Sequence, residues 1–396
     1  MKILSINILY EPYIGGGAET IVKDLCSGLL KRGYNVSVLT FHEKENTNEI
    51  IDGINVFRVK IPNFYLPYFQ GTNRPNAIKR FLWHLVDVYN PVSRKIVKQY
   101  LNIIKPDVII VHNIAGWSPS IWETISKYKV PIIQVLHDSY LLCPRNMFSK
   151  GKICKKQCIK CKVMRFPHKI LSNKTTAVVG VSNFILNHLL SYGYFSKTKI
   201  KTVIYNSRKI DNTNISLKNH NGNIHFGFIG TIAPNKGIEV LLKAYKNINI
   251  ANSKLIIAGD GEKKYVEYLK SKYKDERIKW LGKVRPVDFF SQVDVSIVPS
   301  IWYENLPGVI IESFSFGIPV IGSNIGGISE MVVDKNNGML FNPYNSGELE
   351  EKMALFASNI KYWREKNKDI KNTALKFLDS DAWINQWEQL LKLVVK

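Results

Sequence analysis

The feature that most constrains the fold is a regular alternation of short β-rich runs with helical patterns along the chain. The first β-rich run, Lys2–Leu9, is followed by a helical pattern over Ala18–Lys31 that stops at Gly33. Further β-rich runs lie at Val36–Thr40, Ile54–Lys60, Val108–Val111, Ile132–Leu136, Ala177–Val181 and Lys201–Ile204. Such alternation implies an α/β fold, in which helices cover both faces of a parallel sheet.

The alternation starts again after Asp211–Asn223, an Asn-rich polar stretch that we interpret as a linker. A helical pattern at Gly237–Lys246 is accompanied by strands expected at Ile224–Ile229, Leu255–Ala258, Ile278–Leu281, Val295–Val298 and Val320–Ile321. The sequence therefore predicts two doubly wound, Rossmann-like domains, residues 1–210 and 211–380, facing a cleft at the carboxyl ends of their strands. An amphipathic helix within residues 381–396, carrying Trp383 and Trp387, is expected to pack back on the first domain.

The charge favours an anionic partner. The formal net charge is +23, from 55 Lys and Arg against 32 Asp and Glu, which suits nucleic acid, acidic lipid or a phosphorylated substrate, or is simply a solvated basic surface. No apolar run is long enough to span a bilayer, and the start of the chain is too polar for a signal peptide. We expect a cytoplasmic protein, either free or held at a membrane surface. The aromatic and basic stretch Pro62–Asn90 is either such a surface segment or a buried helix pair.

Two glutamates eight positions apart, Glu304 and Glu312, flank a predicted helix start at Pro307. The amides of Gly308, Val309 and Ile310 would point out of this start, where a diphosphate binds well. Carboxylates on either side of that cradle can accept hydrogen bonds from a ribose and from a hexose. The arrangement predicts a site for a nucleoside-diphosphate sugar, although acidic pairs at this spacing are also common by chance.

Three glycine-rich turns follow predicted strands. Gly15–Glu19 opens a helix but lacks the third glycine of the dinucleotide-binding fingerprint. Gly230–Gly237 carries Lys236, which could reach a diphosphate and neutralise charge on a departing nucleotide. Ser323–Glu330 offers further backbone amides to an anion or a sugar. Each turn alone is as consistent with a structural role as with a binding role.

Two further motifs carry chemistry. His137 and Asp138 follow a hydrophobic strand, where the imidazole could hydrogen-bond a sugar hydroxyl or have a structural role. Four cysteines cluster at Cys143, Cys154, Cys158 and Cys161. The last three have the spacing of an iron–sulfur motif, and all four could form a zinc site. Because the chain does not have the pattern of a barrel, we favour a structural zinc site or free thiols.

Together these motifs resemble glycosyltransferase family 4, the retaining transferases of the GT-B fold. The resemblance covers nearly the whole chain. It rests on the Glu304…Glu312 pair, on Gly16-Gly17, on Gly230…Lys236-Gly237 and on Gly326-Gly327…Glu330. The stretch from His137 through Cys143-Pro-Arg145 resembles a bacterial subset that acts in surface polysaccharide synthesis, such as capsule, O-antigen, lipopolysaccharide or exopolysaccharide.

The resemblance implies a role for each matching residue. Glu304 would hold hydroxyls of the donor sugar and Glu312 the ribose, while His137 would lie near the transferred sugar. The diphosphate would be held by Lys236 and by the backbone amides near Leu306–Val309, such as that of Gly308, with Pro307 as the helix start. Gly16 and Gly17 would border the diphosphate or the acceptor, Val284 the base, and Asp138, Gly326, Gly327 and Glu330 the acceptor or the glycine turn. One departure is Thr231, where the family usually has a basic residue; Arg285 is a candidate to compensate.

The expected activity is retaining transfer of a hexosyl or N-acetylhexosaminyl group from a nucleoside-diphosphate sugar to a hydroxyl of a growing glycan. The resemblance implies a lipid-diphosphate-linked acceptor at the inner, anionic face of the membrane. It implies no metal or other cofactor for the chemistry, with the departing phosphate as the base. The rivals are an epimerase or a phosphorylase on the same fold, and a non-catalytic basic protein binding nucleic acid or membrane. No nucleic-acid-binding signature is present in the sequence, so we expect no nucleic-acid partner.

Overall fold

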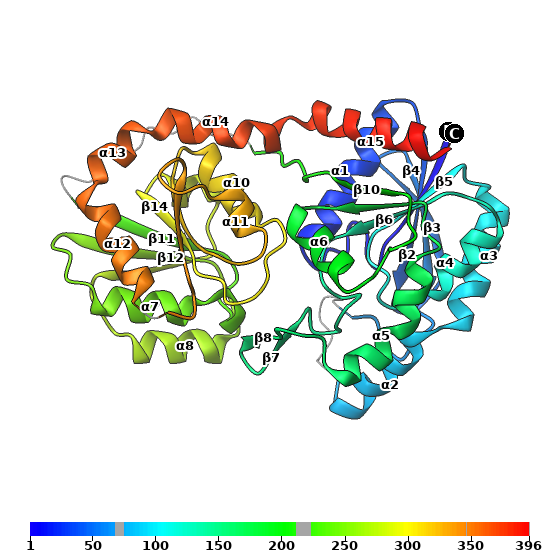
Figure 1. Ribbon diagram of the computed structural model, residues 1–396, viewed down its shortest axis with the longest axis horizontal. Helices are drawn as coiled ribbons and strands as arrows, with labels where there is room; N and C mark the ends of the chain where they lie inside the picture. The colour runs from blue at the N-terminus through cyan, green and yellow to red at the C-terminus, as the bar shows by residue number, and fades with distance from the viewer. Residues whose placement is uncertain (68–74, 211–222, 346, 396) are drawn as a thin grey trace. The chain divides into compact units, whose positions relative to one another are not determined.

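The computed structural model describes residues 1–67, 75–210, 223–345 and 347–395 (Figure 1). The predicted linker at 211–222, and Tyr68 and Phe69 of the aromatic stretch, lie outside these residues. The chain forms two compact units. Unit 1 comprises Met1–Met147, Cys154–Asn206 and Ser380–Lys396, and unit 2 comprises Phe148–Ile153 and Ser207–Asp379.

Unit 1 is built on an eight-stranded sheet in the order β10-β9-β6-β5-β1-β2-β4-β3. Its strands are β1 (Lys2–Ile6), β2 (Asn35–His42), β3 (Thr47–Ile51), β4 (Ile54–Lys60), β5 (Val108–Val111), β6 (Ile132–Leu136), β9 (Ala177–Gly180) and β10 (Ile200–Val203). Central strands such as β5 and β6 are buried at every residue, because helices cover both faces of the sheet. The parallel pairing of the predicted strands is confirmed, whereas β3, which was not predicted, is an exposed edge strand that runs antiparallel to β4.

The helices of unit 1 begin at residues suited to the position. Asn76, Asn90 and Ser182 each accept backbone N–H groups at the starts of their helices. The helices are α1 (Gly17–Lys31), α2 (Ala77–Val88), α3 (Pro91–Ile104), α4 (Ser120–Lys127), α5 (Ile159–Ser172), α6 (Asn183–Ser191) and α15 (Ser380–Val395). The C-terminal helix α15 belongs to this unit and packs on α1, where Ile384 fills the space beside Gly28 and Asp381 pairs with Arg32 at 2.9 Å.

Unit 2 contains a six-stranded, fully parallel sheet in the order β13-β12-β11-β14-β15-β16. The strands are β11 (Ile224–Ile229), β12 (Ser253–Ala258), β13 (Ile278–Gly282), β14 (Val295–Val298), β15 (Val320–Ser323) and β16 (Gly338–Phe341). The helices are η1 (Pro234–Lys236), α7 (Ile238–Asn247), α8 (Lys263–Lys272), α9 (Pro286–Phe290), α10 (Gly308–Ser315), α11 (Ile328–Met331), α12 (Glu348–Ser358), α13 (Ile360–Glu365) and α14 (Asn367–Leu378). A hairpin of β7 (Phe148–Ser149) and β8 (Lys152–Ile153) also belongs to unit 2, and the Phe148 ring meets Trp302 edge-on.

Strand order decides which loops meet. In unit 2 the chain builds the sheet outward from β11 through β12 and β13, then returns to place β14 on the other side of β11. Loops that follow such neighbouring strands meet at the carboxyl edge of the sheet, where open α/β sheets bind ligands. In unit 1 the same holds for the loops after β1, β5 and β6, which are neighbours in that sheet. None of the helices in the described parts of the chain combines the length and apolar character needed to cross a bilayer.

Candidate active site

Glu304 is the centre of a compact polar group in unit 2. Its carboxylate Oε1 accepts hydrogen bonds from Lys236 Nζ at 2.6 Å, Trp302 Nε1 at 2.8 Å and Ser300 Oγ at 2.9 Å. The Lys236 ammonium also lies 5.4 Å from the centre of the Trp302 ring. The loop after β11 supplies Lys236 and the loop after β14 supplies the other three residues, so strand order creates the group. A carboxylate with three donors is held in one orientation.

The glycine turn at Gly326-Gly327 holds the backbone of Glu304 in place. The backbone N–H of Gly327 donates to the carbonyl oxygen of Glu304 at 2.6 Å. A Cβ atom on Gly327 would lie 1.9 Å from the carbonyl oxygen of Asn305, and one on Gly326 would lie 2.5 Å from that of Glu304. We predicted that this turn would offer its amides to an anion or a sugar, and for Gly327 that prediction was wrong, because its N–H is used to hold the Glu304 loop. Glu330 lies in the short helix α11 that follows.

The start of α10 differs in detail from the prediction. Helix α10 begins at Gly308, and Pro307 is the preceding cap residue rather than the first helical residue. The N–H of Ile310 donates to the carbonyl of Pro307 at 3.1 Å, so Ile310 does not offer an unpaired amide as predicted. Gly308 and Val309 remain at the helix start, with the half-buried Leu306 before them.

Arg208 is a site residue that sequence reasoning missed. Its Nη1 atom donates to Glu312 Oε1 at 3.0 Å, and its guanidinium fills the space where a side chain on Gly308 would lie. Burial raises the pKa of Glu312, while the Arg208 charge acts in the opposite direction. Arg208 and Glu312 are 104 positions apart, so no local motif could link them. The structure therefore places the Arg208 cation at the helix start. The sequence analysis had instead named Arg285 as the residue that would replace the basic side chain missing at Thr231.

Arg285 itself has another partner. It is largely exposed and forms a two-pronged ion pair with Asp288, with Nε and Nη2 at 2.7 and 2.8 Å from the carboxylate oxygens. Thr231 is exposed after Gly230, whereas Val284 packs against a buried hydrophobic cluster that includes Phe289.

Gly237 ends the loop that carries Lys236. It adopts a φ of +70°, and a Cβ atom there would lie 1.8 Å from the carbonyl oxygen of Pro299. Only glycine fits this contact, which joins the Lys236 loop to the segment leading to Glu304.

Two histidines form a pair at the carboxyl edge of the sheet in unit 1. His112 Nδ1 and His137 Nε2 lie 3.0 Å apart, and their rings stack with centroids 5.3 Å apart. Both residues line a small pocket together with Asn113 and Asp138. Burial lowers the pKa of His137 to about 4, and burial together with His137 lowers that of His112 well below its usual value. Both rings are therefore neutral near pH 7, and one donates a hydrogen bond to the other. His112 was missed, although it follows the predicted strand Val108–Val111 as His137 follows Ile132–Leu136, so the same signal would have found it.

The first-domain glycine loop opens helix α1, which begins at Gly17 with Gly16 as its cap. Glu19, in the first turn, was also missed. Burial raises its pKa, backbone N–H groups including that of Gly16 lower it, and the Asp138 charge raises it. Burial is also the main cause of the raised pKa of Asp138, whose Oδ1 accepts the N–H of Tyr140 at 2.9 Å. The Asp138 charge thus acts on Glu19 of the glycine loop.

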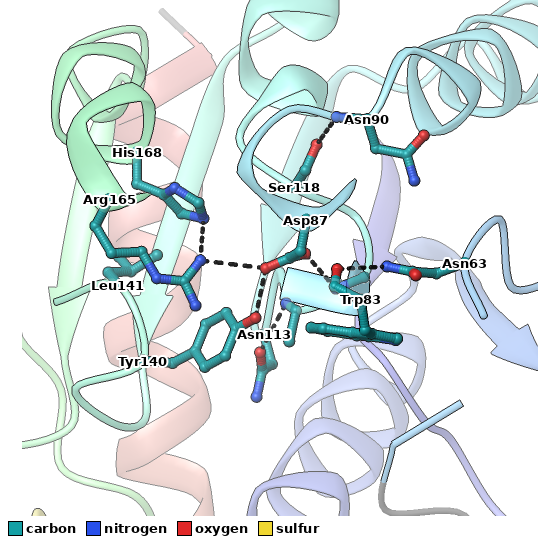
Figure 2. A network of polar contacts seen from close by, with 12 residues as sticks. Asn63, Trp83, Asp87, Asn90, Asn113, Ser118, Tyr140, Leu141, Arg165 and His168 are labelled. Carbon is teal, nitrogen blue, oxygen red and sulfur yellow. Dashed lines mark hydrogen bonds and ion pairs between the residues drawn. The ribbon is translucent and has the colours of Figure 1, made fainter. Parts of the chain in front are cut away.

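A buried ion pair fixes the segment that follows Asp138. Tyr140 donates its hydroxyl to Asp87 Oδ2, and Arg165 Nη1 lies 3.2 Å from the same oxygen (Figure 2). The other Asp87 oxygen accepts the N–H of Gly116 at 2.7 Å, and Arg165 Nη1 also lies 2.8 Å from His168 Nε2. Asp87 and Arg165 are fully buried. Helices α2 and α5 are thereby tied to the loop that carries His137 and Asp138.

The cysteine cluster is only partly assembled. The thiol of Cys161 lies 3.6 Å from Cys143 Sγ, and this hydrogen bond is the main cause of a Cys143 pKa lowered to about 6. Cys154 is half-buried and Cys158 exposed. Over the described ranges, no three His, Cys, Asp or Glu side chains are grouped so that they could hold a metal ion. The zinc alternative therefore stays a prediction that this arrangement does not support.

Comparison with known proteins agrees with this organisation. Residues 15–208 match the model of Glycosyltransferase Family 4, and residues 210–377 match that of Glycosyl transferases group 1. The chain is 32% identical over 336 residues to an uncharacterised 42.6 kDa protein in the cps region of Klebsiella pneumoniae, covering 84% of this chain and 87% of the relative. It is 23% identical to an N-acetyl-D-galactosaminyltransferase of Campylobacter jejuni that acts on an undecaprenol-diphosphate-linked glycan, covering 100% of this chain and 99% of that enzyme.

Solved structures share the fold. Sucrose-phosphate synthase from Thermosynechococcus elongatus superposes with a TM-score of 0.76 at 18% identity, covering 99% of this chain and 98% of that one. HepE from Anabaena in complex with UDP superposes with a TM-score of 0.69 at 19% identity, covering 99% and 100%. The chain therefore belongs to glycosyltransferase family 4 and has the GT-B fold.

Proposed function

We propose that this protein is a retaining glycosyltransferase of polysaccharide synthesis, which moves a hexosyl or N-acetylhexosaminyl group from a nucleoside-diphosphate sugar. The observation that carries the proposal is the Lys236–Glu304 pair beside the start of α10, where Arg208 and Glu312 meet. The two cations and the helix start can bind a diphosphate. The two carboxylates can accept hydrogen bonds from hydroxyl groups on either side of it.

In the proposed mechanism, unit 2 binds the donor. The Lys236 ammonium, the Arg208 guanidinium and the start of α10 stabilise the charge that develops on the departing nucleotide. Donor binding would separate Arg208 from Glu312 and free this carboxylate for the ribose, while Glu304 stays fixed by Trp302 and holds the sugar. The acceptor hydroxyl then attacks from the face that the nucleotide leaves, and its proton passes to the departing phosphate. The new glycosidic bond keeps the anomeric configuration of the donor.

Unit 1 is proposed to bind the acceptor and to contribute His137. Because the His137 pKa is lowered to about 4, the ring is a neutral hydrogen-bonding group at pH 7. A neutral imidazole orients a sugar hydroxyl without adding positive charge beside the forming oxocarbenium-like centre. His112, which is buried at 2% exposure, holds this ring through the 3.0 Å contact between the two imidazoles.

We further propose a lipid-diphosphate-linked acceptor at the cytoplasmic face of the membrane, in the synthesis of a cell-surface glycan such as capsule. The support is the lipid-linked acceptor of the Campylobacter relative and the location of the Klebsiella relative in a cps region. The positive charge of the chain also suits an acceptor that carries a diphosphate.

The test is donor binding by calorimetry against UDP-, GDP- and dTDP-sugars, followed by transfer assays with the sugar that binds. Glu304→Gln and Lys236→Met should each reduce transfer by at least about tenfold, the loss of one charge-assisted hydrogen bond worth roughly 1.5–3 kcal/mol. Lys272→Met is the matched control, because Lys272 pairs with Glu239 at 2.8 Å on the surface of the same unit.

The outcomes separate the parts of the proposal. Equal activity of the Glu304 and Lys236 variants and the Lys272 control would overturn the site assignment. A product with inverted anomeric configuration by NMR would overturn retention while leaving the donor site intact. Release of an altered free sugar without any acceptor would identify an epimerase instead.

A further inference from the structure

Two helices of unit 1 turn continuous apolar stripes toward solvent. On α5 the exposed stripe is Ile159, Val163, Phe166 and Ile170, each between 50% and 81% exposed. At 3.6 residues per turn these four side chains fall within an arc of roughly 60°. On α2 the stripe is Ile78, Phe81, Leu82 and Leu85, each between 40% and 72% exposed. Scattered exposed apolar residues are ordinary, whereas two complete helical stripes are not.

The inward face of α5 is polar and that of α2 carries a charged residue, whereas a normal surface helix buries its apolar face. Helix α5 buries Arg165, His168 and Ser172, and α2 buries Asp87 beside Trp83. Figure 2 shows the Arg165 and His168 side chains directed from α5 toward Asp87 on α2. The ion pair ties the charged sides together inside the unit, so the apolar sides have to face outward.

The two stripes form one surface, which we call the α2–α5 face. The helices pack against each other, as Figure 1 also shows, and Lys160 Nζ of α5 lies 5.2 Å from the ring centre of Phe81 on α2. Exposed basic residues border the stripes: Lys79, Lys155, Lys156, Lys160, Lys162 and Lys169. The one acidic residue of the two helices is Asp87, which is buried and paired.

We propose that the α2–α5 face docks on an anionic lipid surface, with the apolar stripes in the headgroup–acyl boundary and the lysines on lipid phosphates. Apolar side chains flanked by lysines are the composition of interfacial helices, and long lysine side chains extend back toward the headgroups. A second copy of the chain suits the face poorly, because a symmetric contact would bring the same lysines together without any exposed carboxylate on either helix. The inference rests on the proposed function for its purpose, which is to bring the enzyme to a lipid-linked acceptor.

The experiment is co-sedimentation of the full chain with vesicles of phosphatidylglycerol and phosphatidylcholine, compared with phosphatidylcholine alone. We expect binding to the anionic vesicles that weakens as salt is added. Val163→Ser combined with Phe166→Ser should lower the apparent partition coefficient at least about tenfold, since two large side chains leave the bilayer boundary. Leu355→Ser combined with Leu375→Ser is the control in unit 2, where these side chains are 49% and 58% exposed, and it should bind as the parent does.

Charge is tested in the same way. Replacing Lys155, Lys156 and Lys160 by serine should remove most of the preference for anionic vesicles. Replacing Lys254, Lys263 and Lys264, which are exposed in unit 2, removes the same amount of charge away from the α2–α5 face. This control should change the preference for anionic vesicles much less. Equal losses from both triple variants would overturn docking by this face and indicate attraction by net charge alone.

Two further outcomes would overturn the proposal. Vesicle binding unchanged by the Val163 and Phe166 substitutions would exclude the apolar stripe as the docking element. A dimer by light scattering that these substitutions dissociate, without vesicle binding by the parent, would assign the face to a second copy.

Donor affinity in solution is measured on the same samples. Intact donor binding with no vesicle binding refutes the lipid face alone, whereas vesicle binding without donor binding refutes the proposed function alone.

Discussion

Removing one partner of the buried Asp87–Arg165 pair should destabilise unit 1 in a way that depends on which partner is removed. Both side chains are fully buried and 3.2 Å apart. Asp87→Asn leaves the guanidinium buried and charged at any accessible pH, and a lone buried charge of this kind typically costs about 3–5 kcal/mol. Arg165→Met leaves a carboxyl group that still accepts the Tyr140 hydroxyl and the Gly116 N–H, and that can also take up a proton. The cost of Arg165→Met should therefore be lower and should vary with pH.

The sign of that variation follows from the carboxyl group. Burial raises the pKa of Asp87 above its usual value even with Arg165 present, and Arg165 is the largest opposing influence. In Arg165→Met the folded-state pKa rises further. Stability from this group is then fully present below the unfolded pKa, near 3.9, and is lost as the pH rises toward the folded value. Each unit of that rise costs about 1.4 kcal/mol, so Arg165→Met should be less stable at pH 8 than at pH 5, whereas the stability of Asp87→Asn, which lacks this carboxyl group, should change less with pH.

The assay is urea unfolding of the full chain, with hydrogen exchange of peptides from α2 and α5 identifying the transition of unit 1. Asp87→Asn combined with Arg165→Met completes a double-mutant cycle, and its total cost should be less than the sum of the two single costs. Additive costs that do not change between pH 5 and pH 8 would refute the reasoning. The pair would then have to be solvated or uncoupled despite its burial.

Three other measurements test the geometry of the two units. Gly237→Ala should destabilise the Lys236 loop and weaken donor binding, because its Cβ atom would lie 1.8 Å from the Pro299 carbonyl oxygen. Gly282→Ala is the control, because Gly282 has a similar φ of +68° but no atom within 4 Å of the added Cβ. It should cost only about 1–2 kcal/mol of strain and leave donor affinity unchanged. Since the His137 pKa is lowered to about 4, the stability that the neutral ring contributes is present above pH 6.5 and is lost as the pH falls toward 4. In urea titrations, His137→Asn should remove part of this loss of stability at acid pH, at most about 3 kcal/mol. His112→Ala should lower kcat more than His112→Asn, whose amide keeps a polar atom at the Nδ1 position, and equal activity of the two variants would argue against a positioning role.

The sheets could be predicted closely from the sequence where strands are buried on both faces. The strands at Val108–Val111, Ile132–Leu136 and Val295–Val298, which are buried at every residue, have the expected bounds, because nearly continuous apolar runs leave little ambiguity in a parallel sheet. Strand β3 was missed, because it lies at an edge with an exposed, polar pattern, and its pairing depends on its neighbour β4 rather than on its own composition.

The candidate site could be predicted only where its residues are local in sequence. Glu304 and Lys236 were found from short motifs, and the structure brings them to 2.6 Å. Arg208 and Glu19 were missed, because each owes its place to a partner that only the fold brings close, whereas His112 was missed although it follows a predicted strand as His137 does. The Gly327 turn was found but its purpose was misread, since its spacing does not reveal that its N–H is bonded to Glu304.

The position of α15 has a consequence for the order of events during synthesis. Trp383, Trp387 and Leu391 of this helix are buried, and its contacts with α1 include Arg32 and Gly28 near the start of the chain. The ribosome must therefore make all of Ser207–Asp379 before the last helix of unit 1 exists. At about 5–20 residues per second this interval lasts on the order of ten to thirty seconds. During that time unit 1 exposes the apolar side of α1. Unit 2, by contrast, is made as one continuous segment of the chain apart from the earlier β7–β8 hairpin. The first unit to leave the ribosome is thus the last to be completed, and a nascent chain stalled before residue 380 would be a substrate for chaperones.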